Sequence, residues 1–442
     1  MSQPLSRFLR LSLAVALAGA MGAAQAQTEI QWWHSMTGAL NDRVNDFAKG
    51  FNESQKEFKV VPVYKGAYPE SMAAAIAAFR AGNAPHILQV FEVGTATMMG
   101  AKGAIKPVAE VLREGGFKFD QKNYIGPVAG YYTNRKGEML SFPFNSSTPV
   151  FYFNKDVFAK AGLDVNRAPA TWPEVMAAAA KIKAAGASQC AYTSGWPSWV
   201  HVENFSAWHN VPIGTKENGM GGLDTRFQIN SPLHVRHWNN LKDWGQKGYF
   251  TYAGRRNEAE AKFFSGECAM LTSSSAAQAN INRNAKFKYG VAMLPYYADV
   301  AGAPQNSILG GASLWVMSGR KPNEYKGVAQ FLNYLSDSDR QAHWHQTTGY
   351  VPISPTAFEI TKKAGFYEKN PGTDVSVQQM MLKPPTANSK GLRFGSFVQI
   401  RDIFEEEFEN MLSGKQDAKA ALDNSVRRGN EMLTRFEKQT KE

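Results

Sequence analysis

Short apolar runs alternate with amphipathic segments along the first part of the chain. The runs at residues 29–34, 58–64 and 86–91 have the β-branched and aromatic composition of strands. Over residues 40–51 and 69–81, apolar positions recur every three or four residues, which predicts helices between those strands. Strands and helices in this order indicate a doubly wound α/β unit with a mainly parallel sheet.

The edge of such a sheet is where ligands bind, beyond the carboxyl ends of the strands. Glu92 directly follows the third predicted strand, and Tyr68 stands after the second, immediately before its helix. We therefore expect both side chains at the edge where a binding cleft forms.

Residues 142–156 place a polar cluster between two apolar runs, FPF and VFYF. The cluster contains Ser146, Ser147 and Thr148, followed by Pro149, and it does not fit the interior of a buried strand. A segment that leaves one lobe and enters another explains the pattern, because its hydroxyls face the cleft between the lobes. The alternative is an ordinary loop before an ordinary strand.

The remainder of the chain predicts a second α/β lobe. Thr171 and Glu174 have the spacing of a capping box, which starts a helix that ends near Ala185. Trp196 and Trp199 stand in a loop rich in Gly, Ser and Pro, where no helical or strand period places them in a core. We expect them to form aromatic walls for a ligand; packing within the loop is the alternative.

Further segments extend this pattern. A strand within 262–275 ends in a serine run, and Gly310 and Gly311 precede another apolar strand. Glycines at such a position let backbone N–H groups approach a ligand. Additional crossings between lobes are expected at 289–295 and 349–353, and helices at 323–347, 397–412 and 418–437.

The length of 442 residues exceeds what one core usually supports, so two domains are expected. Hydrophobic content of 43% with 20% charged residues is typical of a globular protein. Residues 1–26 stand apart, because Arg7 and Arg10 precede a short apolar run and AQA at 24–26 supplies small residues for cleavage. This pattern predicts a secretory signal peptide cleaved before Gln27, and hence an exported protein.

The net charge of +11 falls to about +9 without residues 1–26, which carry two arginines and no acid. Lysines and arginines are interspersed along the chain, so nucleic acid is not an expected partner. A solvated, mildly basic surface accounts for the surplus; a local positive field around an anionic ligand is the alternative.

Cys190 and Cys268 are the two cysteines of the chain. An even pair in an exported protein indicates one disulfide, and two separately buried thiols are the alternative. Neither cysteine has metal-ligand spacing around it, and we expect no metal and no cofactor.

Several longer motifs are specific enough for comparison: WWHSM at 32–36, YKGAY at 64–68, AAFRAGNAP at 77–85, QVFEVGTATMM at 89–99, PFNSSTPV at 143–150, GGASLWVM at 310–317 and KGLR at 390–393. In these motifs the chain resembles the extracellular solute-binding proteins of ABC importers, and in particular those members that bind sn-glycerol-3-phosphate. The resemblance runs from about Glu29 to the end of the chain.

This resemblance implies an α/β periplasmic binding protein fold, similar to maltose-binding protein, with two lobes hinged by three crossings. The N-terminal lobe is expected to contain residues 27–145 and 296–350, and the C-terminal lobe residues 146–295 and 351–442. A monomer in the periplasm is the implied state.

Ligand contacts also follow from the matching motifs. They are Tyr68, Glu92, Ser147, Trp196, Ser274, Gly311, Tyr350 and Arg401, with Trp199 placed by spacing alone. Ser273 and Ser275 remain alternatives to Ser274. A bidentate cation at Arg401, hydroxyls and a backbone N–H suit a phosphate monoester, and Glu92 suits the hydroxyls of glycerol.

The implied function is capture of sn-glycerol-3-phosphate, or of a glycerophosphodiester such as glycerophosphocholine, in the cleft between the lobes. Ligand would stabilise the closed state of the hinge, and the closed protein would dock on a membrane permease powered by an ATPase. No covalent chemistry is required, so an enzyme is not expected.

Rival interpretations exist. A secreted phosphatase or glycerophosphodiester hydrolase would need metal ligands or an activated nucleophile, and the pairs His343/His345 and His234/His237 are interpreted as structural. An oligosaccharide-binding protein would use stacked tryptophans and a cleft carboxylate equally well. Arg401 could instead pair with the acidic run 405–407.

Overall fold

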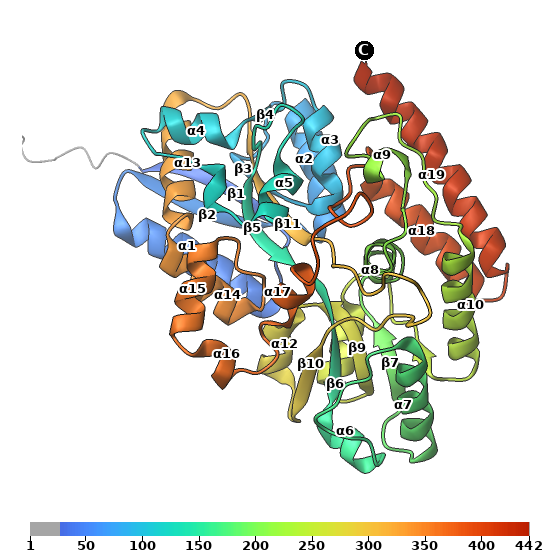
Figure 1. Cartoon of the computed structure of the whole chain (residues 1–442). Helices are drawn as coiled ribbons and strands as arrows, with labels where there is room; N and C mark the ends of the chain where they lie inside the picture. Colours follow the sequence, from blue (N-terminus) through green and yellow to red (C-terminus); the bar gives the residue numbers. More distant parts are fainter. Residues whose placement is uncertain (1–26, 442) are drawn as a thin grey trace, which may run out of the picture.

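The computed structural model describes residues 27–441, so the predicted signal peptide lies outside the described residues. Two lobes are visible in Figure 1, one around the sheet labelled β1 to β5 and β11, the other around the sheet labelled β6, β7, β9 and β10. None of the helices in the described part of the chain is long and apolar enough to cross a membrane.

The sheet of the N-terminal lobe has the strand order β2-β1-β3-β11-β4, with β5 paired to β11. Its strands are β1 (Thr28–His34), β2 (Phe58–Tyr64), β3 (Ile87–Phe91), β4 (Ile105–Lys106), β5 (Phe142–Ser147) and β11 (Gly310–Met317). The predicted parallel unit is confirmed, because β1 pairs in parallel with both β2 and β3. The later strand β11 runs antiparallel to β3, β4 and β5.

Helices of this lobe alternate with its strands, and three more follow β11 later in the chain. They are α1 (Gly38–Ser54), α2 (Tyr68–Arg80), α3 (Thr95–Gly100), α4 (Val108–Glu114), α5 (Gly126–Tyr132), α13 (Pro322–Leu335), α14 (Ser338–Thr348) and α15 (Pro355–Lys363). The helix expected at 323–347 is therefore two helices. Asp337 separates them, because its side chain accepts a hydrogen bond from Arg340 N and caps α14.

The sheet of the C-terminal lobe has the order β10-β6-β9-β7-β8. Its strands are β6 (Pro149–Asn154), β7 (Cys190–Ser194), β8 (Phe250–Thr251), β9 (Cys268–Ser274) and β10 (Tyr289–Ala292). Its helices include α6 (Lys155–Lys160), α7 (Trp172–Ala184), α8 (Phe205–Trp208), α10 (Pro232–Gln246), α11 (Glu258–Phe264), α12 (Ala277–Asn284), α18 (Phe397–Leu412) and α19 (Ala418–Lys441). Short helices α9 (Thr215–Asn218), α16 (Phe366–Lys369) and α17 (Val375–Met380) lie in the connections.

The capping box predicted at the start of α7 is confirmed. Glu174 N donates to Thr171 Oγ1 at 3.3 Å, and Thr171 N donates to Glu174 Oε2 at 3.1 Å. Two backbone donors that the helix leaves unpaired are thereby satisfied by its own first turn.

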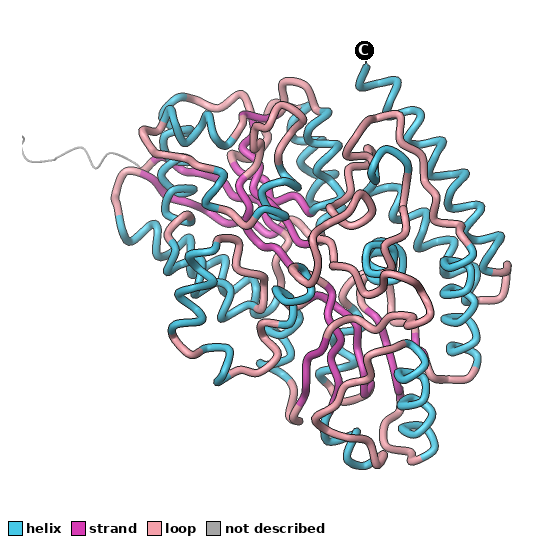
Figure 2. The backbone as a smooth tube through the Cα atoms, viewed as in Figure 1, coloured by secondary structure: helices cyan, strands magenta, loops and turns pink. Residues whose placement is uncertain are grey.

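The first crossing is also confirmed. Only Thr148 separates β5 from β6, yet β5 belongs to one sheet and β6 to the other, as the two groups of magenta strands in Figure 2 show. A second connection joins β10 to β11 through residues 293–309.

The region of the third expected crossing forms no strand. Val351 makes a single bridge to Ser146, and Ile125 N donates to Ile353 O at 2.9 Å. The following helix α15 packs against α14, so the chain remains in contact with the N-terminal lobe beyond residue 350. The lobe boundaries given above stay a prediction.

A disulfide joins Cys190 and Cys268, as the sequence predicts. The two residues begin β7 and β9, which are adjacent parallel strands, and they face each other in the register. Their sequence separation of 78 residues makes the bond a cross-link over a long loop.

Replacing both cysteines by alanine is expected to lower the free energy of unfolding by about 2–4 kcal/mol, because the cross-link limits the unfolded chain. Denaturant unfolding of the variant and of the wild type measures the difference. Ligand binding in native buffer should be unchanged, since the bond lies at the opposite end of β9 from Ser274. Equal unfolding free energies would contradict a stabilising bond.

Candidate ligand-binding cleft

A pocket lies between the two lobes, and all nine residues predicted as ligand contacts line it. They are Tyr68, Glu92, Ser147, Trp196, Trp199, Ser274, Gly311, Tyr350 and Arg401. The first crossing passes through this place, because Ser147 ends β5 and stands opposite Gly310 of β11 in the sheet register.

Tyr68 begins α2 and its ring stacks on Phe91, with 5.0 Å between ring centroids. Asn145 of β5 orients the phenol: its Nδ2 donates to the Tyr68 hydroxyl at 3.0 Å, and its Oδ1 accepts from Gln89 at 2.8 Å. The Tyr68 oxygen accepts this bond, and its hydroxyl is also hydrogen-bonded to that of Tyr350. Tyr350 lies beside it and stacks on Trp344.

Gly311 has a φ of +91°, and a Cβ at this position would lie 1.8 Å from the carbonyl oxygen of Asn145. A side chain there would be strained and would collide with β5, so the position requires glycine. Both glycines begin β11: Gly311 is explained by close backbone approach at the crossing, and Gly310 by the ring of Trp199 packed against it.

Ser274 lines the pocket, whereas its two neighbours in the serine run, Ser273 and Ser275, are not among the lining residues. Ser273 Oγ donates to Glu260 at 2.8 Å, and Ser275 is buried. Ser274 Oγ accepts from Ala276 N at 3.2 Å, which leaves the hydroxyl proton free to donate.

The two tryptophans approach the pocket through unusual backbone. Trp196 has a positive φ of 52°, and its backbone N–H donates to the backbone carbonyl oxygen of Arg256 at 2.8 Å. Trp199 begins a π-helical turn (Trp199–Asn204), a form that is frequent at functional sites. Its ring packs on Gly310, and within residues 27–441 its buried indole N–H has no hydrogen-bond partner.

Arg401 of α18 is buried and held by two carboxylates. Its Nε and Nη2 donate to Glu203 Oε1 and Oε2, both at 2.8 Å, and Nη2 also donates to Glu92 Oε1 at 2.7 Å. Burial opposes the charge of Arg401, but Glu203 and Glu92 outweigh it and raise its pKa. Burial raises the pKa of Glu92, and the nearby charge of Glu203 adds to the rise, while Arg401 opposes it.

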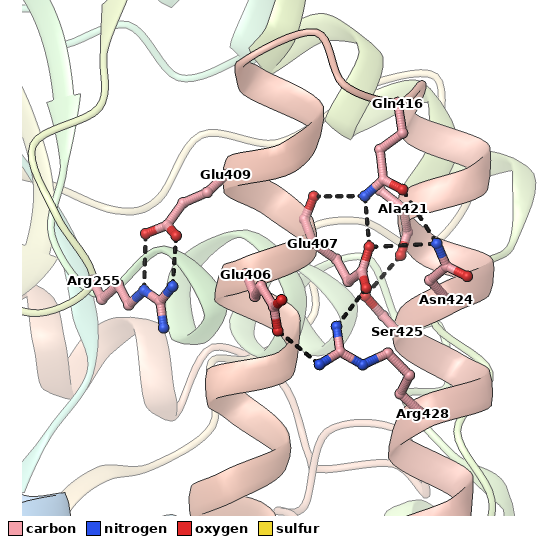
Figure 3. Close-up of polar contacts among 9 residues, drawn as sticks. All are labelled: Arg255, Glu406, Glu407, Glu409, Gln416, Ala421, Asn424, Ser425 and Arg428. Carbon is pink, nitrogen blue, oxygen red and sulfur yellow. Dashed lines mark hydrogen bonds and ion pairs between the residues drawn. The ribbon is translucent and has the colours of Figure 1, made fainter.

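The alternative partner for Arg401, the acidic run 405–407, is wrong. Figure 3 shows Arg428 of α19 between Glu406 and Glu407, with contacts of 2.7 and 2.6 Å. Glu405 instead accepts from Ser198 N at 2.8 Å, and burial raises its pKa to about 8. Helix α18 therefore ties the tryptophan loop to the pocket through Glu405, while Arg401 contacts the N-terminal lobe.

Sequence reasoning missed three charged residues of this region. Arg256 and Glu260 line the pocket, and the fully buried Glu203 forms an ion pair with Arg401. A signal existed for Glu260, which stands three residues before Phe263 and so falls on the apolar face of its helix. The same holds for Glu203, an acid inside the apolar stretch WVHVENFSAW.

The histidine pairs lie outside the pocket. His234 and His237 are buried in α10, and His345 is buried in α14 with its Nε2 against the hydroxyl of Tyr367. Within residues 27–441, no group of three or more His, Cys, Asp or Glu side chains is arranged to hold a metal ion.

The two lobes, with a pocket between them that combines aromatic walls and polar groups, define a class of protein. A family model described as bacterial extracellular solute-binding protein matches residues 46–373, and the chain belongs to this family. Among relatives, the sn-glycerol-3-phosphate-binding periplasmic protein UgpB of Brucella melitensis is 54% identical over 428 residues, covering 96% of this chain and 98% of that protein. The protein of the same name from Pectobacterium atrosepticum is 53% identical, covering 97% and 96%.

Solved structures show the same fold. The crystal structure of UgpB from Mycobacterium tuberculosis in complex with glycerophosphocholine has a TM-score of 0.77 at 20% sequence identity, covering 92% of this chain and 99% of that one. Maltose-bound MalE3 of Thermotoga maritima has a TM-score of 0.73 at 17% identity. The predicted maltose-binding-protein-like α/β fold is confirmed.

Proposed function

We propose that this chain is the periplasmic substrate-binding component of an ABC importer and that it captures sn-glycerol-3-phosphate. One observation carries the proposal: the eight residues assigned to ligand contact from separate motifs, and Trp199 assigned by spacing, line a single pocket between the lobes. Relatives at 53–54% identity over almost the whole chain are named for this ligand, which supports the assignment.

The pocket offers different partners to the two ends of such a ligand. Hydroxyls of Tyr68, Tyr350, Ser147 and Ser274, with the backbone N–H of Gly311, suit phosphate oxygens. The phosphate is therefore proposed to lie against neutral donors at the crossing.

Arg401 takes a different role from the one that the sequence indicates. Its Nε and Nη2 are already bonded to Glu203 and Glu92, so a bidentate grip on phosphate would break existing ion pairs. We assign Arg401 and Glu92 together to the vicinal hydroxyls of the glycerol end, where Arg401 donates and Glu92 accepts.

Capture in the cleft would stabilise the closed arrangement of the lobes, because the ligand bonds to both. The closed monomer would then deliver its ligand to membrane permease subunits and, through them, to the ATPase. The chain itself performs no covalent step in this proposal.

Calorimetric titration of the mature protein with sn-glycerol-3-phosphate tests the function. We expect saturable one-to-one binding, with no release of inorganic phosphate on prolonged incubation. Binding of maltose-like sugars without binding of the phosphate ester would keep the fold and overturn the ligand. Phosphate release by the pure protein would overturn the absence of covalent chemistry.

A further inference from the structure

Glu260 is an acid of the pocket without a basic partner. It lies in α11 with 6% of its surface exposed and lines the pocket. Its Oε1 accepts a hydrogen bond from Ser273 Oγ at 2.8 Å. Within residues 27–441, no Lys, Arg or His side chain forms an ion pair with Glu260. The two arginines of the pocket have other partners: Arg256 pairs with Asp402 at 3.2 Å, and Arg401 pairs with Glu92 and Glu203.

The other groups around Glu260 do not neutralise it. On its own helix, Glu258 adds a second negative charge. The charged residue of the neighbouring α12, Arg283, pairs with Asp42 of α1 at 2.6 Å. Tyr152 of β6 and Tyr350 of the opposite lobe are the titratable groups that face it from the other sides, and both carry neutral hydroxyls.

Burial without a cation disfavours the charged carboxylate. It raises the pKa of Glu260 to about 7, so both protonation states are accessible near neutral pH. A buried charge of this kind is costly unless a ligand supplies the missing partner or a proton removes the charge.

The charge of Glu260 affects which phosphate ester the pocket can bind. A phosphate monoester carries close to two negative charges at neutral pH, and it would share the pocket with the Glu260 carboxylate. A diester carries one negative charge, and its second substituent can carry a positive one. Trp196 lines the same pocket as Glu260, so an ammonium group bound there can also contact an aromatic ring.

We propose that Glu260 selects the phosphate ester by its state of ionisation. As a carboxylate it favours a diester whose second substituent is an ammonium group. As a carboxylic acid it donates a hydrogen bond to the phosphate and admits a monoester together with one proton from solvent. The inference rests on the proposed function of the cleft and names a residue that decides ligand class within it.

The test compares wild type with Glu260→Gln, which keeps the acceptor for Ser273 and removes the charge. Each protein is titrated with sn-glycerol-3-phosphate and with glycerophosphocholine near pH 8, in two buffers of different ionisation enthalpy. For Glu260→Gln we expect monoester affinity to rise and choline-diester affinity to fall, each by about tenfold, the size of one charge-assisted contact. Proton uptake with the monoester should appear in wild type and be reduced in the variant.

A matched control removes one negative charge from the same lobe outside the pocket. Glu267→Gln breaks only an ion pair with Lys262 and should leave both affinities and the proton count unchanged. The second pKa of the ligand phosphate acts equally on all three proteins, so the differences between them report Glu260.

The outcomes separate the two proposals. If wild type binds both esters and Glu260→Gln shifts both affinities in the same direction, or leaves proton uptake intact, the selection by Glu260 is overturned while the proposed function stands. If wild type binds neither ester, the proposed function fails and the selection fails with it. A thermal melt of each variant confirms that the binding data come from folded protein.

Discussion

Arg401→Ala is expected to lower the free energy of unfolding by about 3–5 kcal/mol near pH 8, because it leaves the buried Glu92 and Glu203 without their shared cation. Affinity for sn-glycerol-3-phosphate should fall by about ten- to hundredfold, the loss of one charge-assisted bond and of the orientation of Glu92. Denaturant unfolding and calorimetric titration measure the two effects.

The pH dependence of this destabilisation tests its cause. Burial raises the pKa of Glu92 and Arg401 opposes the rise, so without Arg401 the folded state binds more protons than the unfolded state and regains stability as the pH falls. The difference from wild type should therefore be smaller near pH 5 than near pH 8. A pH-independent difference would point to lost packing rather than to unpaired charge.

A control for Arg401→Ala is an ion pair made by Glu409, near the C-terminal end of the same helix α18. Arg255 Nε donates to Glu409 at 2.8 Å, as Figure 3 shows. This pair is partly exposed and lies outside the pocket. Arg255→Ala should cost about 1 kcal/mol or less, because solvent screens such pairs. Its ligand affinity should equal that of wild type.

Acid should destabilise the protein strongly below about pH 6.5. A cluster of four buried histidines lies in the C-terminal lobe, and burial lowers the pKa to about 3 for His201 and His234, to about 4 for His209, and well below its usual value for His237. His201 Nδ1 lies 3.0 Å from His237 Nε2, and His237 Nδ1 lies 3.1 Å from the hydroxyl of Tyr297. Each ring is thus neutral in the folded state.

The sign follows from proton linkage. Unfolded histidine binds a proton below about pH 6.5, whereas the folded rings do not, so stability is lost as the pH falls from that value toward the folded pKa values. Near pH 5.5 each ring costs about 1.3 kcal/mol relative to neutral pH, roughly 5 kcal/mol for the four. Glu405 and Glu260, whose pKa values are raised, act in the opposite direction and reduce the net slope.

A single substitution isolates the histidine contribution. His234→Gln removes one ring that is hydrogen-bonded to Ser206 and Ser231. Between about pH 7.5 and 5.5, the variant should lose about 1.4 kcal/mol less than wild type in denaturant unfolding. His343→Gln, on an exposed face of α14, should not change the slope. Parallel pH profiles for wild type and His234→Gln would contradict the linkage.

Local patterns determined much of the fold. The apolar periods at 40–51 and 397–412 predicted α1 and α18, and the capping box predicted the start of α7. These features depend on neighbours within a few residues in the chain, so periodicity and capping chemistry reveal them. The break between α13 and α14 was missed because an Asp cap inside a helical pattern has a weak local signal.

The site itself was accessible through residue types and motif resemblance. Tyr68, Glu92 and Ser147 stand at strand ends and at a crossing, where sequence order alone brings them to a cleft. What sequence could not decide was which charges meet there. Glu203 follows Glu92 by more than a hundred positions and Arg401 comes much later still, so their contact is created only when the two lobes assemble.

The sequence by itself therefore determined the class of fold, the first crossing between the lobes, the disulfide pair and nine of the residues that line the pocket. Tertiary structure alone decided the partners of Arg401, the isolation of Glu260 and the burial of the histidine cluster. The physical reason is that secondary structure follows from short-range periodicity, whereas the ionisation of a buried group depends on desolvation and on charges brought close from distant parts of the chain.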